Sequence, residues 1–278
     1  MRTARNDRSR RGTRALAPYV DEVRGEAVRR FEQRHGGRTL GPVVVVIAAL
    51  DEAGGIEDVV GRIPARACGE AVDTIVVDDG SADGTSAVAE AAGALVVRLE
   101  RNCGHGVALR VGYALAREHG ARYIVTLDGD GQWDPAHLEP VLEPVVRDEA
   151  DFVIGSRVLG ATEAGDRFRQ LGVHVFAALV RLLTGVAVTD TSSGFRAMRA
   201  EVTATVRQEQ VQYQTSELLI GAIAQGYRIA ERPVVMRRRT AGVSKKGGNA
   251  FYGVRYARVV VGTWWRERGT HPASSRGA

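Results

Sequence analysis

Two aspartates with the potential to bind a metal, Asp128 and Asp130, follow the apolar run 123–127 and are separated by one glycine. A β-branched run that ends in polar residues is typical of a buried strand opening onto a loop, and open α/β sheets bind ligands at that edge. No basic residue lies within four positions of either aspartate. A divalent cation such as Mg2+ or Mn2+, which prefers oxygen ligands, would neutralise them. The alternative is a solvated acidic loop.

A second acidic pair, Asp78 and Asp79, ends the apolar run 72–77 and is followed by Gly80, Ser81 and Asp83. Carboxylates in this position can hydrogen-bond a nucleobase edge or ribose hydroxyls. They can also cap the turn and the helix that follows. We assign capping mainly to Ser81 and Asp83, and ligand binding to the pair.

Basic residues in two places could bind phosphate. Arg157 follows the run 152–155 and a Gly-Ser pair, so its guanidinium could form a fork onto phosphate oxygens, or else a surface ion pair. The glycine-bearing segment 237–249 carries Arg239 and Lys245. A mobile basic loop suits a phosphate group that must be enclosed and released, whereas a solvated charge run is the alternative.

The elements that must position these residues alternate along the chain. Apolar runs at 43–49, 72–77, 94–99, 123–127 and 152–155 predict strands. The segments between them predict helices at 55–68 (as far as the break at Pro64), 82–92, 104–119 and 135–147. This alternation predicts an α/β fold with a mostly parallel central sheet flanked by helices. Later segments predict helices at 168–183, 216–224 and 250–265, a polar loop at 189–196 and a strand at 227–235.

Composition excludes several classes of protein. The chain has 278 residues, 44% of them hydrophobic, and a net charge of +5. No apolar stretch approaches the length of a membrane span, and no signal peptide is evident. Two cysteines, Cys68 and Cys103, are too few for a disulfide framework and predict a reducing, cytoplasmic setting. Arginines crowd residues 1–14, which we expect to form a disordered basic arm.

Five ordered motifs resemble family 2 glycosyltransferases. They are Val-Val-Asp-Asp-Gly-Ser-x-Asp-Gly-Thr at 76–85, Asp-Gly-Asp-Gly-Gln at 128–132, Ile-Gly-Ser-Arg at 154–157, Thr-Asp-Thr-Ser-Ser-Gly-Phe-Arg-Ala at 189–197 and Arg-Thr-Ala-Gly-Val-Ser-Lys at 239–245. The last two resemble the polyprenyl-phosphate branch, which is similar to dolichyl-phosphate mannosyltransferases. The resemblance implies a Rossmann-like GT-A fold, a nucleotide-sugar donor, a divalent metal and inversion at the anomeric carbon.

The resemblance also implies an organisation. We expect a basic arm at 1–14, an N-terminal helix at 15–37, a GT-A domain at 38–249, a C-terminal helix at 250–267 and a flexible tail at 268–278. Within the domain, 42–160 would bind the nucleotide and 161–249 the acceptor.

The site residues implied by the resemblance fall into four groups. The metal ligands are Asp128, Asp130 and Gln132. The donor nucleotide would contact Ala48, Leu50, Glu52, Asp78, Asp79, Asp128, Gly129 and Arg157. The acceptor phosphate would contact Arg167, Arg169, Arg239, Ser244 and Lys245. Catalytic roles fall to Asp130, Arg157, Asp190 and Glu217.

Several alternatives stay open at this stage. A polyprenyl phosphate is already ionised and needs no base, whereas a small-molecule hydroxyl acceptor needs a carboxylate, for which Asp190 and Glu217 are the candidates. The segment 48–52 departs from the family's Pro-x-Tyr-Asn-Glu, so UDP and GDP donors both remain open. The helix at 251–268 could pack on the domain or rest on the inner face of an anionic membrane. Intact Asp128, Asp130 and Gln132 argue against an inert scaffold whose basic arm and loops bind nucleic acid or anionic lipid.

Overall fold

The computed structural model describes residues 24–163, 167–238 and 249–268. The predicted basic arm, the start of the predicted N-terminal helix and most of the predicted tail lie outside these residues. Helix 24–35 opens the described chain. The strands are β1 (Val43–Ala49), β2 (Arg66–Ala67), β3 (Glu70–Asp78), β4 (Leu95–Arg98), β5 (Tyr123–Asp128), β6 (Phe152–Thr162), β7 (Arg196–Arg199) and β8 (Ile229–Met236). The further helices are α2 (Ile56–Gly61), α3 (Thr85–Ala91), α4 (His105–Glu118), the 3-10 turn η1 (Pro135–His137), α5 (Leu138–Val146), α6 (Arg167–Thr184), α7 (Ala200–Thr205), α8 (Gln214–Ala224) and α9 (Asn249–Glu267).

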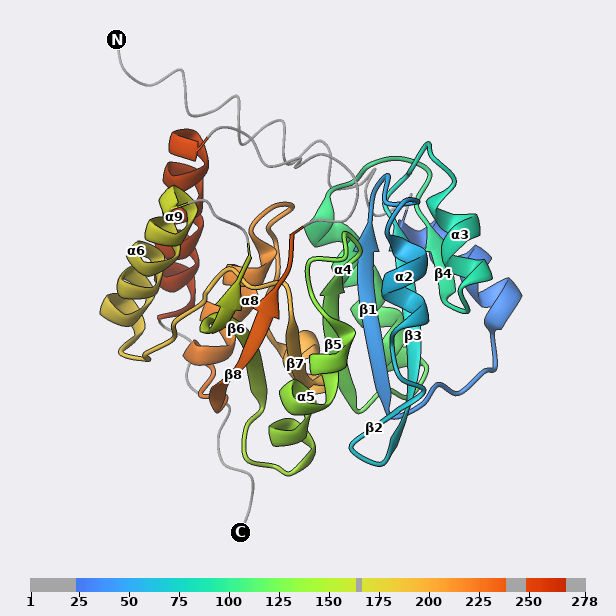
Figure 1. Cartoon of the computed structure of the whole chain (residues 1–278), viewed down its shortest axis with the longest axis horizontal. Coiled ribbons are helices and arrows are strands. Elements are labelled where there is room, and N and C mark those ends of the chain that lie inside the picture. The colour runs from blue at the N-terminus through green and yellow to red at the C-terminus, as the bar shows by residue number, and fades with distance from the viewer. Residues whose placement is uncertain (1–23, 164–166, 239–248, 269–278) are drawn as a thin grey trace.

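One sheet forms the centre of the molecule, with helices on both sides (Figure 1). Its strand order is β2-β3-β1-β5-β7-β6-β8, with β4 also paired to β3. The pairs β1–β3, β1–β5, β3–β4 and β6–β8 are parallel, whereas β7 is antiparallel to both β5 and β6. The predicted α/β fold with a mostly parallel sheet is confirmed.

The strand β7 is one of three elements in the described chain that the sequence pattern did not predict, together with β2 and α7. It has four residues, with arginine at both ends, so it shows no recognisable apolar run. Its two central residues, Ala197 and Met198, are fully buried between β5 and β6. Because β7 runs against its neighbours, the loop before it lies at the same edge as the carboxyl ends of β5 and β6.

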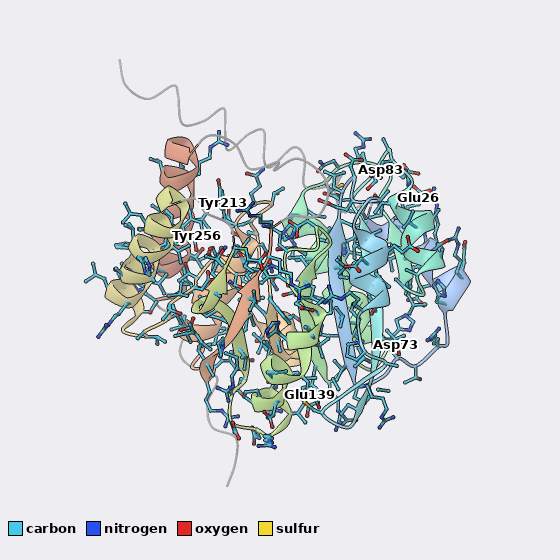
Figure 2. The ribbon with its side chains drawn as sticks, in the orientation of Figure 1. Glu26, Asp73, Asp83, Glu139, Tyr213 and Tyr256 are labelled. Atoms are coloured by element: carbon cyan, nitrogen blue, oxygen red, sulfur yellow. The ribbon has the colours of Figure 1, made fainter. Side chains whose placement is uncertain are left out.

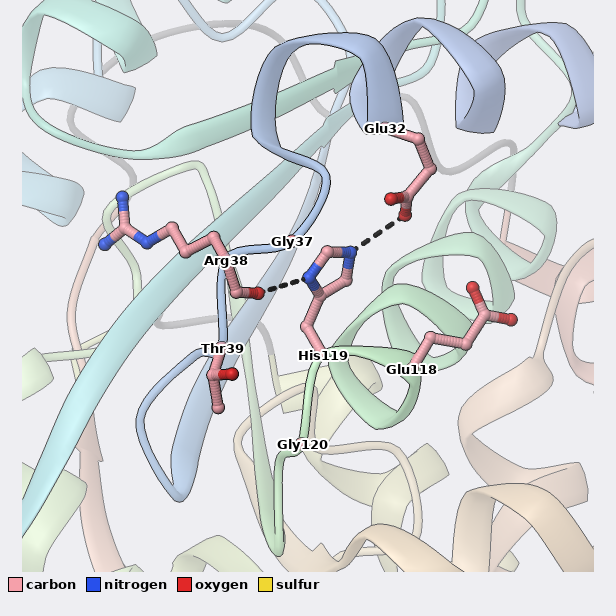
Figure 3. A pocket seen from close by; sticks show the side chains of 7 residues that line it. All are labelled: Glu32, Gly37, Arg38, Thr39, Glu118, His119 and Gly120. Atoms are coloured by element: carbon pink, nitrogen blue, oxygen red, sulfur yellow. Dashed lines mark hydrogen bonds and ion pairs between the residues drawn. The ribbon is translucent and has the colours of Figure 1, made fainter.

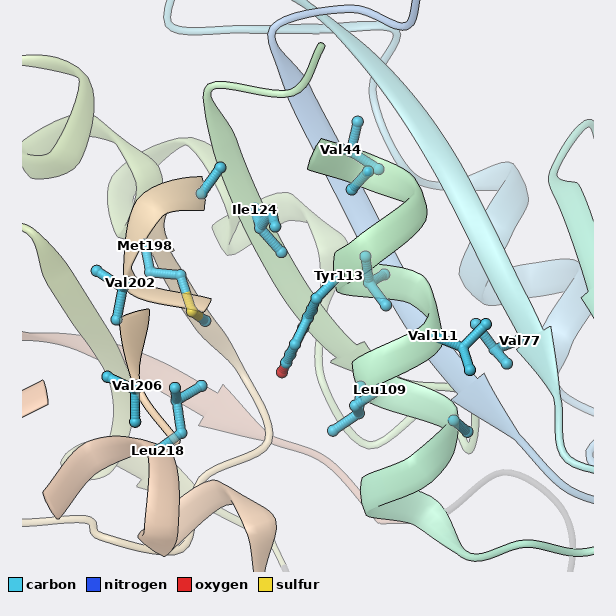
Figure 4. Close-up of a cluster of buried hydrophobic side chains, with 14 of the residues drawn as sticks. Val44, Val77, Leu109, Val111, Tyr113, Ile124, Met198, Val202, Val206 and Leu218 are labelled. Atoms are coloured by element: carbon cyan, nitrogen blue, oxygen red, sulfur yellow. The ribbon is translucent and has the colours of Figure 1, made fainter. Parts of the chain in front are cut away.

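The core consists of two apolar clusters, one on each face of the sheet. In β1, Val44 and Val46 belong to the cluster under α4, and Val43, Val45 and Ile47 belong to the cluster under α2 and α5. All five side chains are fully buried, which explains the continuous apolar run. Figure 4 shows the first cluster, where α4 lies across the sheet and packs toward the helices α7 and α8.

None of the described helices is long and apolar enough to cross a membrane. The helices α6 and α9 lie side by side at one end of the molecule, and helix 24–35 lies at the other (Figure 1).

The contact between α4 and β1 depends on a glycine. A Cβ atom at Gly112 would lie 2.4 Å from Cγ1 of Val46 and 3.1 Å from Cγ2 of Val77. We predict that Gly112→Ala lowers the free energy of unfolding by about 1–3 kcal/mol, the usual cost of overpacking a core. Urea denaturation measures the change.

The matched control is Gly262→Ala in the interior of α9. A Cβ there would meet no atom within 4 Å. We expect this change to raise stability by up to about 1 kcal/mol, since alanine is the better helix former. Equal effects at Gly112 and Gly262 would contradict the packing argument.

Candidate active site

The parallel register brings the two predicted acidic pairs to one edge of the sheet. Ala48 of β1 pairs with Asp128 of β5, and Ala49 pairs with Asp78 of β3. Asp128 and Asp78 therefore lie on either side of the carboxyl end of β1. This is the edge at which open α/β sheets bind ligands.

The loop after β1 is held against the loop after β3. The amide of Asp51 donates to Oγ of Ser81 (2.9 Å), and the amide of Ala82 donates back to Oδ1 of Asp51 (2.9 Å). The amide of Ala53 donates to Oδ2 of Asp83 (3.0 Å), a residue labelled in Figure 2. Asp51 has a positive φ of 48°, which this double contact maintains. The two loops therefore form one unit, which contains the predicted donor residues Leu50 and Glu52.

Asp78 is fully buried, and its oxygens accept hydrogen bonds from the protein. Oδ1 accepts from the amide of Ser81 (2.7 Å), and Oδ2 accepts from the hydroxyl of Ser86 and lies 3.5 Å from Nη1 of Arg98. These contacts shape the turn after β3. They give Asp78 a structural role that requires no ligand.

Asp79 joins the turn after β3 to the start of α4. Its Oδ1 accepts from the amide of Cys103 (2.7 Å), and its Oδ2 accepts from the amide of Gly104 (2.8 Å). Gly104 has a φ of 99°, and a Cβ there would lie 2.2 Å from Val211, so this turn requires glycine. The Asn102-Cys103-Gly104 segment therefore shapes the backbone at the start of α4.

Asp128 is more accessible than Asp78, Asp79 and Asp130, with 32% of its side chain exposed. Its Oδ2 accepts from Nε1 of Trp133 (2.9 Å), and its Oδ1 lies 3.8 Å from Nε2 of His105. Gly194, in the loop before β7, leaves the room that this carboxylate occupies, since a Cβ there would lie 2.5 Å from Oδ2.

Asp130 and Gln132 continue the loop. Asp130 is 6% exposed, and its Oδ1 accepts from the amide of Gln132 (3.0 Å), which folds the segment into a tight turn at Gly131. The carbonyl of Gln132 accepts from the amide of Arg237 (2.8 Å), the first residue after β8. The loop is thereby tied to the end of β8.

Trp133, in the loop after β5, could either support that loop or cover a bound sugar. It is 2% exposed, its ring packs against Phe195 at 6.3 Å between centroids, and the guanidinium of Arg157 lies 5.7 Å from the ring centre. Together with its bond to Asp128, these contacts favour the role of a support beneath the loop. They do not favour a cover over a sugar.

Arg157 and Asp190, both predicted to be catalytic, form a buried ion pair with each other. Nε of Arg157 donates to Oδ2 of Asp190 (2.7 Å), and Nη2 donates to Oδ1 (2.8 Å) and to Oγ of Ser192 (2.6 Å). The Asp190 side chain is fully buried, and that of Arg157 is 12% exposed. The remaining nitrogen, Nη1, lies 3.2 Å from the thioether sulfur of Met236, which is a weak acceptor.

Two residues that the sequence did not single out hold the loop 189–195. Glu231 of β8 accepts from the amide and hydroxyl of Thr189 (2.8 and 3.0 Å) and from the amide of Asp190 (3.1 Å). Arg196 of β7, 1% exposed, donates to the carbonyls of Ser193 and Thr191 (2.8 and 2.9 Å). Burial lowers the pKa of Arg196. A buried arginine satisfied by backbone carbonyls has no local sequence signal, because its partners depend on the loop fold.

Glu217 is fully buried on α8 and binds other parts of the chain. Its Oε2 accepts from the amides of Glu209 and Gln210 (2.9 and 2.8 Å), and its Oε1 lies 3.0 Å from Nη1 of Arg266 on α9. These contacts fix α8 to α9. They are the contacts of a structural hydrogen-bond acceptor, the alternative to a catalytic base.

The predicted acceptor residues are mostly beyond what the structure describes. Arg239, Ser244 and Lys245 lie outside the described residues. Arg167 and Arg169 belong to the first turn of α6, for which the backbone alone is described.

A hollow of about 480 Å³ lies elsewhere, between helix 24–35 and the end of α4 (Figure 3). In it, His119 lies 2.8 Å from Oε1 of Glu32 and 2.7 Å from the carbonyl of Arg38. Burial lowers the pKa of His119, but these two acceptors outweigh it and raise the pKa above its usual value. Since the hollow adjoins the segment that leads into β1, it lies at the edge of the sheet opposite Asp128. The contact between His119 and Glu32 anchors helix 24–35 to the end of α4.

Comparison with known proteins decides the family. Residues 44–207 match the model of glycosyl transferase family 2. The chain belongs to glycosyl transferase family 2. It is a glycosyltransferase.

Two curated relatives of this family 2 chain share most of its length. The polyprenol monophosphomannose synthase of Mycolicibacterium smegmatis is 32% identical over 233 residues, covering 80% of this chain and 86% of the relative. The dolichyl-phosphate hexose transferase of Haloferax volcanii is 33% identical over 207 residues, covering 74% and 87%.

A solved relative supports the GT-A fold. It is the glucosyl-3-phosphoglycerate synthase of Mycobacterium tuberculosis, solved with Mn2+, uridine diphosphate and glucosyl-3-phosphoglycerate. Its identity to this glycosyltransferase is 25%, the TM-score is 0.63, and the match covers 89% of this chain and 86% of the other.

The carboxylates of this glycosyltransferase fit a hard divalent cation that is bound partly by the protein and partly by phosphate oxygens of the substrate. Within the described ranges, no three His, Cys, Asp or Glu side chains form a metal-binding group. Asp128 and Asp130, with the amide oxygen of Gln132, would supply an incomplete set of oxygens. Mg2+ is commonly bound in this way, by one or two carboxylates plus substrate phosphates and water.

The Asp79 contact gives a pH dependence with a defined sign. Burial raises the pKa of Asp79 to about 6, and hydrogen bonds from the amides of Cys103 and Gly104 offset this in part. An aspartate in an unfolded chain titrates near pH 4. Ionisation therefore opposes folding, and the contribution of this group is fully present below about pH 4 and is lost as the pH rises through about 6.

We predict that the stability of the wild type relative to Asp79→Asn falls between about pH 4 and about pH 6 and is constant above that range. Urea denaturation of both proteins across this range measures the difference. A difference that does not change with pH would show that the carboxyl is not buried as described.

Proposed function

We propose that this glycosyltransferase moves a sugar from a nucleotide-sugar donor to polyprenyl phosphate, with inversion and with the help of Mg2+ or Mn2+. The observation that carries the proposal is the convergence of Asp79, Asp128, Asp130 and Arg157 at the carboxyl edge of one sheet. Two curated relatives that span most of the chain support it by their names, a polyprenol monophosphomannose synthase and a dolichyl-phosphate hexose transferase.

The donor nucleotide would lie across the joined loops after β1 and β3. This unit presents Leu50 and Glu52 from one loop and Asp79 from the other, next to Ala48 and Gly129 at the strand ends. Each Asp79 oxygen already accepts one amide, which fixes the carboxylate in place. A carboxylate oxygen has a second lone pair, so Asp79 can still accept from a base or a ribose hydroxyl.

The cation would be held by Asp128, Asp130 and Gln132 together with the donor's two phosphates. When bound, it stabilises the negative charge that develops on the leaving nucleoside diphosphate. Trp133 orients Asp128 from below through Oδ2, so the carboxylate cannot rotate freely. His105, 3.8 Å from the other oxygen, adds positive charge to the site when it is protonated.

The hydrogen bonds that Asp190 accepts favour a sugar acceptor that is already ionised. Both oxygens of Asp190 accept from Arg157, so use of this residue as a base would require the ion pair to open. A phosphate monoester carries its own ionised oxygen near neutral pH and needs no base. Arg157 can bind such a phosphate through Nη1, whose present partner is the weak sulfur acceptor of Met236.

A small-molecule acceptor is the second candidate, because the solved relative carries glucosyl-3-phosphoglycerate. Transfer to a hydroxyl would require a base, and Asp190 is the carboxylate nearest to Arg157. Glu217 is bound to α9 and to the backbone at 209–210.

The decisive experiment measures release of nucleoside diphosphate from UDP- and GDP-sugars with Mn2+. We expect a short polyprenyl phosphate to stimulate release and to become glycosylated, with the opposite anomeric configuration in the product. Stimulation by phosphoglycerate or another hydroxyl acceptor, and not by the lipid, would contradict the proposed acceptor. Retention of configuration would contradict the proposed mechanism.

The metal assignment has its own test. We expect Asp130→Asn to abolish the stimulation of UDP or GDP binding by Mn2+, because one of two anionic ligands is lost. We expect Trp133→Phe, which keeps the ring but loses the bond to Asp128, to weaken Mn2+ binding about 10–100-fold, the usual effect of removing a supporting partner. Calorimetric titration measures both.

The control is Asp148→Asn, the same chemical change at an exposed residue paired with Arg199 and Arg228. Its Mn2+ affinity should equal that of the wild type. Wild-type affinity in Asp130→Asn would show that the cation is bound elsewhere.

A further inference from the structure

The outer face of α9 is an exposed stripe of apolar and basic residues. Val254, Arg258, Val261 and Trp265 follow one another at positions i, i+4, i+7 and i+11, so they share one side of the helix. Val254 is 71% exposed and Trp265 is 62% exposed. The opposite side is buried and consists of Tyr256, Val260, Thr263 and Glu267.

The helix α6 repeats this pattern. Leu171, Val175, Ala178 and Leu182 have the same spacing, and all four are exposed, with Leu182 at 80%. Val173 and Val180 on the other side are buried. An apolar stripe directed away from the core has no role in the packing of the domain.

The two helices form a single layer. Tyr256 of α9 packs against Phe176 of α6, with 4.1 Å between ring centroids, and against Tyr213 at the start of α8, with 5.7 Å. Tyr213 and Tyr256 are labelled in Figure 2. Both helices contact α8 as well as each other, and they lie side by side at the end of the molecule (Figure 1). Their outer stripes therefore belong to one surface, which we call the α6–α9 face.

The charge of this face has one sign. The segment 167–184 contains no acidic residue, and the segment 249–267 contains one, Glu267. Glu267 is 3% exposed and pairs with Arg266. Exposed arginines border the two stripes at Arg181, Arg255 and Arg268, and the exposed Arg258 lies within the α9 stripe.

We infer that the α6–α9 face docks on an anionic lipid surface. Apolar side chains on one side of a helix, bordered by arginines, can enter the boundary between headgroups and acyl chains while the guanidinium groups contact lipid phosphates. Trp265 suits that boundary, and the guanidinium of Arg268 lies 3.5 Å from the centre of its ring.

The sign of the charge argues against other occupants. A second copy would bring its own arginines against these arginines, with no exposed acidic residue on either helix to compensate. The N-terminal segment 1–14 carries six arginines and one aspartate, so it is also repelled. Acidic phospholipid is complementary to the face, and each basic residue near such a surface contributes favourably.

The face is continuous in the chain with the site. The helix α6 follows β6, which carries Arg157, and α9 follows β8, which ends at Met236 beside Arg157. Docking would hold the acceptor half of the site near the membrane in which a polyprenyl phosphate is embedded, a consequence that rests on the proposed function.

Cosedimentation of the full chain with vesicles tests the inference. We expect binding to vesicles of equimolar phosphatidylglycerol and phosphatidylcholine, and much weaker binding to phosphatidylcholine alone. Arg258→Glu should lower the partition coefficient at least about fivefold, since one basic residue near an anionic surface contributes about 1 kcal/mol. Trp265→Gln, which leaves the charge unchanged, should lower it as well.

The matched control is Arg29→Glu, the same change at an exposed residue of helix 24–35, at the opposite end of the molecule (Figure 1). It should bind as the wild type does. Equal losses in Arg258→Glu and Arg29→Glu would assign binding to net charge and overturn the inference. A wild-type protein that does not bind the vesicles would also overturn the inference. So would a wild-type dimer that Leu182→Glu converts to a monomer.

Vesicle binding requires no donor and no turnover, so its outcome is separate from that of the transfer assay. A protein that binds anionic vesicles but does not glycosylate polyprenyl phosphate would contradict the proposed acceptor alone. A protein that glycosylates a detergent-dispersed acceptor but ignores vesicles would contradict the docking face alone.

Discussion

The buried ion pair between Arg157 and Asp190 connects the two halves of the site. Arg157 comes from β6 and Asp190 from the loop before β7, and Glu231 of β8 holds the backbone of that loop. On its other side Arg157 lies over Trp133, which binds Asp128. A pair of this kind adds little to stability compared with apolar residues of similar size, but loss of one partner leaves an uncompensated buried charge and costs about 3–5 kcal/mol. Its main effect here is therefore to fix the relative positions of three strands.

The antiparallel strand β7 makes this connection possible. In a fully parallel sheet, the loop before a strand lies at the edge opposite the ligand site. Because β7 runs against β5 and β6, the loop 189–195 instead lies beside the carboxyl end of β5. The hydroxyl of Thr126 donates to the carbonyl of Gly194 (2.7 Å), and the absent side chain of Gly194 leaves space for the Asp128 carboxylate. The strand that breaks the parallel pattern thus supplies one wall of the site.

Most of the sheet could be predicted from the sequence because its signals are local. The valine run of β1 is buried on both faces, and strands alternate with helices in the chain. The acidic residues Asp79 and Asp128 could be assigned to one edge because the strands that precede them are parallel. In contrast, β7 has an arginine at each end and shows no apolar run. The pairing of Arg157 with Asp190 joins residues 33 positions apart, and that of Glu231 with Thr189 spans 42 positions. Such partners are chosen by the tertiary fold, so each residue appears in the sequence as an independent catalytic or surface group.

The ion pair also bears on which acceptor chemistry the site favours. A base must be able to take up a proton. Both oxygens of Asp190 already accept short hydrogen bonds from the guanidinium of Arg157, which does not give up a proton. The same arrangement leaves Arg157 with its charge at the site and with Nη1 directed at a thioether. A phosphate oxygen is a much stronger acceptor than that sulfur, so an anionic acceptor can bind Arg157 without disturbing Asp190. This arrangement is our reason for proposing an acceptor that is ionised before it binds and not one that must be deprotonated there.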